Sequence, residues 1–309
     1  MPLTPLFGTN SAKVTEPVSD QPRRSDTVTY DRRALSYAAS FDSPARQAFV
    51  WGMEWLTGKL VVLRMVRKFE RMGAVTGPGF WQAALQAQGI TITTPPEQIA
   101  RIPASGPVVL VANHPHGMVD GMVLAALIAQ RRGDFKILSR SLLAGLDAEA
   151  ARHMIPVPFP DHPDAHLDMI AMRRATMAHL ADGGLIALFP AGVVATSDSL
   201  LGPAIEADWK VFTAKMIRLS GATVVPCYFP GANSRAYQMA NRISPLLRQS
   251  LLLHEIVRLR NTAMAPAIGA PIPFAQLAPR LRDPRSLMAW LRTQTLALGQ
   301  RVGTGTSPR

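Results

Sequence analysis

Short apolar runs alternate with longer helical segments along most of this chain. The runs are rich in Val, Ile and Leu and are bounded by Gly, Pro, Asn or Asp, which is typical of buried strands. In the segments between them, apolar residues recur at helical spacing. We expect strands at residues 90–93, 108–112, 135–139, near 157, 185–189 and 223–229, and a β-rich stretch at 264–274.

Strands separated by helices predict an α/β fold, because parallel strands need long crossover connections that helices usually provide. The central sheet should therefore be mostly parallel and flanked by helices on both faces. The stretch TTPPEQIARIPASGP is expected to be a linker. We expect helices at residues 44–72, 80–88, 118–131, 165–182, 206–219, 234–242, 244–261 and 285–301.

An amphipathic helical segment is predicted before the sheet. Residues 49–66 form its most apolar stretch, but Glu54, Lys59 and Arg64 interrupt it, and each is costly at a bilayer centre. We therefore predict no transmembrane span. Glu54 and Arg64 fall on one helical face, while the two tryptophans lie mainly elsewhere. Such a helix suits the headgroup layer of an anionic membrane, or it packs on the core, and the sequence leaves both readings open.

The composition divides the chain into regions and limits the classes of partner that we expect. We expect a disordered tail at 1–30, a helical, membrane-associating segment at 31–90, an α/β domain at 91–303 and a tail at 304–309. The formal net charge of +12 favours acidic partners, namely phospholipid headgroups, nucleic acid or an acidic carrier protein. A single cysteine, Cys227, excludes a disulfide framework. The N-terminus contains no continuous apolar stretch, so no secretory signal is predicted.

Three loops rich in Gly, Pro and small polar residues follow three of the expected strands. Their sequences are NHPHGMVDG after Ala112, PAGVVATSDS after Phe189 and PGANSR after Phe229. The carboxyl ends of parallel strands meet at one edge of a sheet, where ligands usually bind, so we expect one site there. Three explanations compete for His114, His116 and the nearby acid: a plain loop, a metal site, or a general base with an orienting carboxylate.

The residues NHPHGMVDG, FPAG and VVPCYFPG, in this order, resemble the glycerolipid or lysophospholipid acyltransferase family. That family has Asn-His, four residues and Asp as its first motif, and Phe-Pro-Glu-Gly as its third. The resemblance covers roughly residues 105–235. Five residues separate His114 from Asp120, a spacing associated with a His-Pro-x-Gly-x-x-Asp branch, the HxxxxxD motif.

The third motif departs from the family pattern. Ala191 replaces its Glu, and Val193-Val194 replace the Thr-Arg that usually follows the glycine. In the family, that Arg is expected to clamp a phosphate. Its absence points away from lysophosphatidate and leaves room for other lysophospholipids and for lyso-aminolipids as acceptors.

The resemblance implies a peripheral membrane O-acyltransferase at the cytoplasmic face of the inner membrane. It would move a fatty acyl group from an acyl carrier protein (ACP) or coenzyme A (CoA) thioester to a lyso-lipid hydroxyl, with no other cofactor and no nucleic-acid partner. His114 would be the general base and Asp120 its orienting acid, as in hydrolase triads with the substrate hydroxyl in place of serine. N–H groups around Ala191 and Gly192 would bind the oxyanion. The substrate-binding residues implied are Asn113, Gly117, Arg140, Pro190, Ala191, Gly192 and Arg235.

Several of these residues have a simpler interpretation. Arg140 lies where the family places substrate-binding residues, but it is equally consistent with a surface charge. His116 either lines the acceptor pocket or lies in solvent, and we expect the second. Arg173 and Arg174 are expected to be solvated on their helix, and Arg235 is the candidate that replaces the missing headgroup clamp.

The main alternative is a metal-dependent hydrolase that uses His114 and His116. However, Met118 and Val119 occupy the positions where its motif requires Asp and His. A serine hydrolase is disfavoured because the Gly-x-Ser-x-Gly elbow is missing. A basic binding protein without catalytic activity would not need a His–Asp pair at a strand end.

Overall fold

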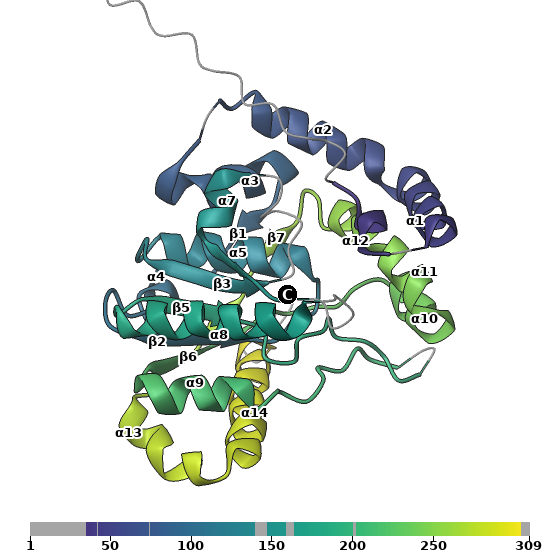
Figure 1. Ribbon diagram of the computed structural model, residues 1–309. Helices are drawn as coiled ribbons and strands as arrows, with labels where there is room; N and C mark the ends of the chain where they lie inside the picture. Colours follow the sequence, from purple (N-terminus) through teal and green to yellow (C-terminus); the bar gives the residue numbers. More distant parts are fainter. Residues whose placement is uncertain are drawn as a thin grey trace, which may run out of the picture.

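A mostly parallel sheet with helices on both faces forms the centre of the computed structural model (Figure 1), which confirms the predicted fold class. The structure describes residues 35–41, 43–73, 75–139, 147–158, 164–199 and 202–303. The tails predicted at 1–30 and 304–309, and Arg140, lie outside these residues.

Within the described residues, the main sheet has six strands in the order β4-β3-β5-β2-β6-β8. Its first five strands run parallel, and β8 pairs antiparallel with β6. A separate two-stranded parallel sheet joins β1 to β7, so the strand expected at 90–93 is not part of the main sheet. The bounds are β1 Thr91–Ile92, β2 Val108–Ala112, β3 Phe135–Ser139, β4 Met154–Pro156, β5 Leu185–Leu188, β6 Thr223–Tyr228, β7 Ala263–Met264 and β8 Ala267–Ile268.

Both faces of the main sheet are buried, which explains why its strands are continuous apolar runs. Alternate residues of β2 enter two different cores: Leu110 packs with α3 and α5, whereas Val109 packs with α8, α9 and α14. Figure 1 shows these two helical layers on opposite sides of the strands. The covering helices are α3 Phe80–Gln88, α5 Met118–Ala129, α7 Ala148–Arg152, α8 Ala165–Ala181, α9 Phe212–Ser220 and α14 Pro284–Gly303.

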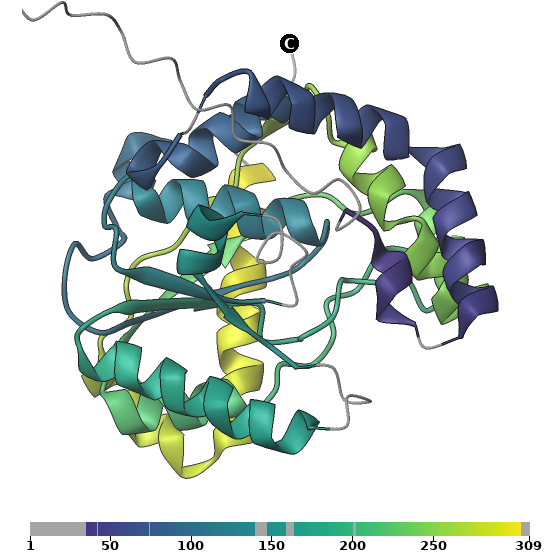
Figure 2. The same cartoon turned by 45° about the horizontal axis from the view of Figure 1, so that its top comes forward.

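The single helix expected at 44–72 is two helices, α1 Pro44–Thr57 and α2 Lys59–Glu70, with the break at Gly58. A Cβ at this position would lie 3.1 Å from a Val257 methyl group and 3.2 Å from the Leu253 carbonyl oxygen. The break therefore sits where α12 packs closely against the chain. Figure 2 shows α1 and α2 meeting at an angle beside the helices α10 to α12.

Although the helical pattern groups it with the exposed Arg64, Glu54 is buried. Its carboxylate accepts hydrogen bonds from the Ser36 hydroxyl at 2.6 Å and from the Tyr37 N–H at 2.7 Å. The buried ammonium group of Lys59 donates to the Leu35 carbonyl. These contacts hold residues 35–37 against the inner sides of α1 and α2, whereas Trp51 and Trp55 are exposed on the outer side of α1.

Other differences lie in the connections. The helix expected at 206–219 begins at Phe212, because Glu206 and Trp209 fold inward against the site described below. The helix expected at 244–261 is two helices, and the expected linker contains the short α4. The remaining elements are α4 Pro96–Ile99, α10 Arg235–Ile243, α11 Pro245–Ser250, α12 Leu252–Arg258, α13 Phe274–Leu277 and the 3-10 turns η1 Tyr37–Ser40, η2 Gly77–Gly79 and η3 Ala278–Arg282.

Across the described ranges, none of the helices combines the length and the apolarity needed to traverse a lipid bilayer.

Candidate active site

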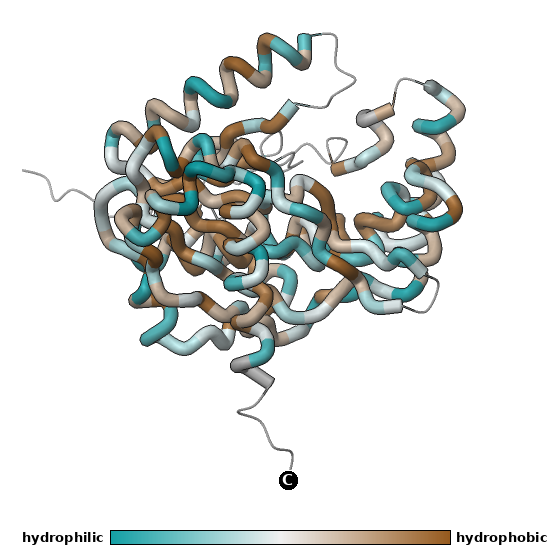
Figure 3. The backbone as a smooth tube through the Cα atoms, turned by 90° about the horizontal axis from the view of Figure 1, so that it is seen from below, coloured by the Kyte–Doolittle hydropathy of each residue, from teal (hydrophilic) through white to brown (hydrophobic). Residues whose placement is uncertain are grey.

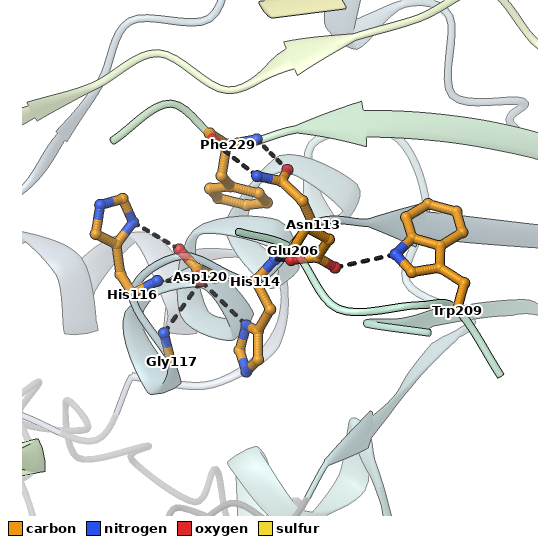
Figure 4. A network of polar contacts seen from close by, with 8 residues as sticks. All are labelled: Asn113, His114, His116, Gly117, Asp120, Glu206, Trp209 and Phe229. Carbon is orange, nitrogen blue, oxygen red and sulfur yellow. Dashed lines mark hydrogen bonds and ion pairs between the residues drawn. The ribbon is translucent and has the colours of Figure 1, made fainter. Parts of the chain in front are cut away.

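The loop after β2 is tied to the end of β6 by one buried amide. The Asn113 side chain donates to the Phe229 carbonyl oxygen at 2.9 Å and accepts from the Phe229 N–H at 2.7 Å (Figure 4). Both polar atoms of the amide are therefore satisfied by the backbone. Asn113 thus holds two strand ends in register at the carboxyl edge of the sheet, which is a structural task beside the substrate-binding role predicted for it.

Asp120 lies in the first turn of α5 and points back to the loop that precedes it. One of its oxygens accepts from the backbone N–H groups of His116 at 2.8 Å and Gly117 at 3.1 Å. The same oxygen lies 3.0 Å from Nδ1 of His114. Gly117 has φ of +81°, a conformation that favours glycine and lets the chain turn sharply into the helix. The five-residue spacing is accommodated by this turn, and the structure brings the predicted base and acid together.

His116 also contacts this carboxylate, contrary to the expectation that it lies in solvent. Its side chain is 5% exposed, and its Nδ1 lies 2.9 Å from the second oxygen of Asp120 (Figure 4). An ionised carboxylate only accepts hydrogen bonds, so Nδ1 of each imidazole carries the proton. In a neutral His114, Nε2 is then the basic nitrogen.

Asp120 is fully buried, and burial by itself would raise its pKa. The hydrogen bonds from His114 and His116, together with their charges, outweigh this effect and hold the pKa of Asp120 below its usual value. The carboxyl group therefore stays ionised at neutral pH and can stabilise a positive charge that forms on His114.

Glu206 is a site residue that the sequence analysis missed. Its buried carboxylate accepts from the His114 N–H at 3.0 Å and from the Trp209 indole N–H at 3.0 Å (Figure 4). Burial raises the pKa of Glu206, although both donors oppose the shift. Arg292 donates to the Glu206 backbone carbonyl. Glu206 therefore positions the backbone of the proposed base. It lies 92 positions after His114 in the sequence, so no short motif contains both residues.

Two cavities meet at His114, whose ring stacks on Phe189 with 3.9 Å between ring centroids. We call them the α8 cavity and the α5 cavity. The α8 cavity, of about 350 Å³, is bordered by α8 and α9, and the α5 cavity, of about 150 Å³, runs along α5. Both cavities are lined by His114, Ser139, Phe189 and Val194. The imidazole is therefore accessible from two sides.

An apolar cavity of about 90 Å³ lies beyond the α5 cavity, under α2 and α3. It shares Met118 and Met122 with the α5 cavity, so the two spaces adjoin across these flexible side chains. Its other walls are mostly aliphatic and aromatic, including Val66, Phe69 and Phe80.

Some of the remaining predicted substrate-binding residues line these cavities and others do not. Pro190 and Gly192 line the α8 cavity and Gly117 lines the α5 cavity. Ala191 is buried, and Arg235 lines none of these cavities and donates to the Gly202 carbonyl at 3.1 Å.

Of the two N–H groups expected to bind the oxyanion, that of Gly192 donates to the Phe189 carbonyl at 2.9 Å. The Ala191 N–H has no acceptor among the described residues. It is therefore the better of the two candidates for an oxyanion donor.

In the part of the chain that the structure describes, no group of three or more His, Cys, Asp and Glu side chains is arranged to hold a metal ion. The two imidazoles instead direct Nδ1 to the same carboxylate. A metal-dependent hydrolase would instead need ring nitrogens of these histidines to point at a common metal ion.

The fold and the site define an α/β protein with a carboxylate-oriented imidazole at the carboxyl edge of its sheet, an arrangement suited to deprotonating a hydroxyl group. The acyltransferase family matches residues 42–256, and the chain belongs to this family. This confirms the class of enzyme that the motifs predict.

Two curated relatives are both lyso-glycine lipid O-acyltransferases. The protein of Phocaeicola vulgatus is 28% identical over 184 residues, which cover 57% of this chain and 63% of the relative. That of Bacteroides thetaiotaomicron is 27% identical over 184 residues, covering 57% of this chain and 64% of the relative. The match thus spans less than two thirds of the relatives. The crystal structure of the 1-acyl-sn-glycerophosphate (LPA) acyltransferase PlsC from Thermotoga maritima aligns over 85% of this chain and 90% of that chain, with 12% identity and a TM-score of 0.47.

Proposed function

We propose that this protein is an O-acyltransferase that moves a fatty acyl group from an ACP or CoA thioester to the hydroxyl group of a lyso-lipid. The observation that carries the proposal is the 3.0 Å contact between His114 Nδ1 and Asp120 at the junction of the two cavities. This junction gives a donor and an acceptor separate routes to the same imidazole.

Neutral His114 accepts the hydroxyl proton at Nε2 while the substrate oxygen attacks the thioester carbonyl carbon. The tetrahedral oxyanion is bound by the Ala191 N–H. When the intermediate collapses, the C–S bond breaks and the imidazolium returns the proton to the departing thiolate. Asp120 stays ionised throughout and stabilises the imidazolium. The products are the acylated lipid and the free thiol, and no protein nucleophile takes part.

The apolar spaces support binding of the acyl chain along α5. The route from His114 passes Met118 and Met122 and continues under α2 and α3, where the walls are almost entirely apolar. An acyl chain lying there would place its thioester beside His114. The α8 cavity is then left for the acceptor.

The acceptor we propose is a lyso-lipid other than lysophosphatidate, with lyso-aminolipids as the first candidates. Val194 occupies the position of the family's phosphate-clamping Arg, and both curated relatives are named for a lyso-glycine lipid. A valine provides no charge for a phosphate. Lysophospholipids with other headgroups remain within the proposal.

An assay of the purified protein tests the function directly. Acyl-ACP and acyl-CoA are each offered with lyso-glycine lipid, lysophosphatidate and lysophosphatidylethanolamine, and mass spectrometry follows the products. We expect a diacyl product and one released thiol per acyl group transferred, with the lyso-aminolipid preferred. The proposal would be contradicted if the thioester were hydrolysed as fast without a lyso-lipid acceptor as with one. It would also be contradicted if no lyso-lipid were acylated.

We also propose that α1 and α2 bring the enzyme to an anionic membrane at the cytoplasmic face of the inner membrane. Trp51 is 55% exposed and Leu56 is 81% exposed, so α1 directs large apolar side chains outward. Figure 3 shows the tube of α1, at the right, with hydrophobic and hydrophilic residues following one another. Arg64, Lys68 and Arg71 are exposed on and just after α2. Apolar side chains flanked by basic ones suit the headgroup layer.

Changing Trp51→Ser and Leu56→Ser together should lower partitioning onto anionic vesicles at least about tenfold, because two apolar side chains no longer insert. Added salt should release the wild-type protein, since its basic residues are screened. Vesicle sedimentation measures both effects. Leu219→Ser is the matched control, because Leu219 is 58% exposed on α9, away from α1 and α2 (Figure 1). Equal loss in the control, or salt-insensitive binding, would contradict the proposed surface.

A further inference from the structure

Two basic side chains border the α8 cavity, and we call Arg173 and Lys210 the cationic pair. Arg173 belongs to α8, and Lys210 precedes α9, so the two residues approach the cavity from different elements. Both are exposed. Arg173 was expected to be merely solvated, and its position at the cavity is a consequence of the tertiary fold.

Local contacts position both cations. The Lys210 N–H donates to the Pro190 carbonyl at 3.0 Å, which fixes its backbone beside the third motif. A Cβ at Gly192 would lie 2.9 Å from the Lys210 ammonium nitrogen, so the ammonium group occupies space that a glycine leaves open. The guanidinium carbon of Arg173 lies 5.6 Å from the Phe212 ring centroid, within the range of a cation–π contact.

The positive charges of the pair are not neutralised by nearby acids. Among the described residues, neither Arg173 nor Lys210 takes part in an ion pair, and the described lining of the α8 cavity contains no Asp or Glu. Uncompensated cations at the mouth of a cavity attract anionic ligands. The cavity that reaches His114 is therefore electropositive at this end.

The pair lies apart from the position that the family motif assigns to a cation. That position is Val194, whose methyl group would be 3.5 Å from a Cβ at Gly117, so it faces the turn at the start of α5. Val194 supplies no charge there. The basic groups of this chain instead stand at the α8 and α9 side of the cavity.

We propose that Arg173 and Lys210 bind the anionic group of the acceptor's headgroup, a carboxylate in the case of an amino-acid lipid. This inference rests on the proposed acyltransferase function. A carboxylate matches the geometry of a guanidinium, and it can accept a further hydrogen bond from an ammonium group. With its anion held by the pair, a lyso-lipid would direct its free hydroxyl toward His114, which lines the same cavity.

The alternative ligand is a phosphate of the donor. In a lyso-lipid, only a few bonds separate the free hydroxyl from the headgroup anion. In CoA and in ACP, the whole pantetheine arm separates the thioester from the nearest phosphate. Because the pair shares one cavity of about 350 Å³ with His114, the shorter separation fits better and the acceptor is favoured.

The test compares two lyso-lipids that differ only in charge, one with a glycine headgroup and one with the neutral glycinamide. We expect the wild type to prefer the glycine headgroup about tenfold in kcat/KM, mainly through KM. In the Arg173→Gln, Lys210→Gln double variant, this preference should fall toward one. The matched control is Arg174→Gln with Lys215→Gln, because both side chains are exposed on α8 and α9 but do not line the cavity.

The possible outcomes separate this inference from the function on which it rests. If the wild type acylates neither lipid, the acyltransferase proposal itself fails. If it acylates them without preferring the anion, or if the double variant keeps the preference, the cationic pair is not the headgroup site. A rise in KM for acyl-CoA or acyl-ACP, with KM for the acceptor unchanged, would assign the pair to the donor and overturn the inference. An equal effect in the control variant would show a general loss of positive charge instead.

Discussion

Acyl transfer should fall by at least about 10²- to 10⁴-fold when His114 is replaced with alanine, because the reaction loses its general base. The fold should persist, since the His114 side chain is partly exposed and, within the described ranges, its ring donates only to Asp120. The backbone N–H that binds Glu206 is still present in alanine. The measurement is the steady-state rate of diacyl product formation, with circular dichroism and thermal unfolding as the check on folding.

A suitable control for this variant is His166→Ala. His166 is exposed on α8 and lines neither the α8 cavity nor the α5 cavity, so its loss should leave the rate close to that of the wild type. Undiminished turnover in His114→Ala would remove the proposed mechanism. Loss of activity together with a collapsed unfolding transition would leave only a structural role for His114.

Asp120→Asn is expected to lower kcat by about two to four orders of magnitude while the substrate KM changes little. The amide carries no charge to stabilise an imidazolium. Its NH₂ group would also face N–H groups that donate hydrogen bonds to the carboxylate in the wild type. His114 would then shift to the tautomer with its proton on Nε2, and Nε2 could no longer accept the proton of the substrate hydroxyl. Steady-state kinetics with saturating donor measure the effect. Wild-type kcat in this variant would show that the contact with Asp120 does not support catalysis.

The same substitution should also destabilise the fold by about 2 kcal/mol at neutral pH, because buried donors lose their acceptor. Since the folded-state pKa of Asp120 is below its usual value, the carboxylate stabilises the native state above the unfolded pKa. This contribution is lost as the pH falls through the folded pKa. The difference in unfolding free energy between wild type and variant should therefore shrink in acid. A difference that is constant with pH would contradict the assigned ionisation of Asp120.

The elements that carry the site were predictable because their signals are local. A buried parallel strand such as 108–112 must be apolar on both faces, and Asn113, Pro115 and Gly117 mark its end in the sequence itself. His114 and Asp120 stand six positions apart, so a single turn into a helix suffices to join them. Their contact in the structure agrees with that expectation, and their catalytic roles remain predictions.

Contacts between distant parts of the chain were not predictable in the same way. The helical pattern groups Glu54 with the exposed Arg64, but its hydrogen bonds to Ser36 and Tyr37 place it inside. Glu206 belongs to a segment expected to be helical and instead turns inward to meet the backbone of His114. Periodicity along one segment contains no information about which distant backbone group will bind a buried carboxylate.

The sequence by itself determined the sheet, the strand-end loops and the pairing of His114 with Asp120, because each follows from side-chain alternation or from residues within one turn. Only the tertiary structure decided that Glu206 supports the base and that Arg173 and Lys210 line the same cavity. These arrangements depend on how separate elements pack. Packing is fixed by the burial and hydrogen bonding of the whole core, and no short stretch of sequence specifies it.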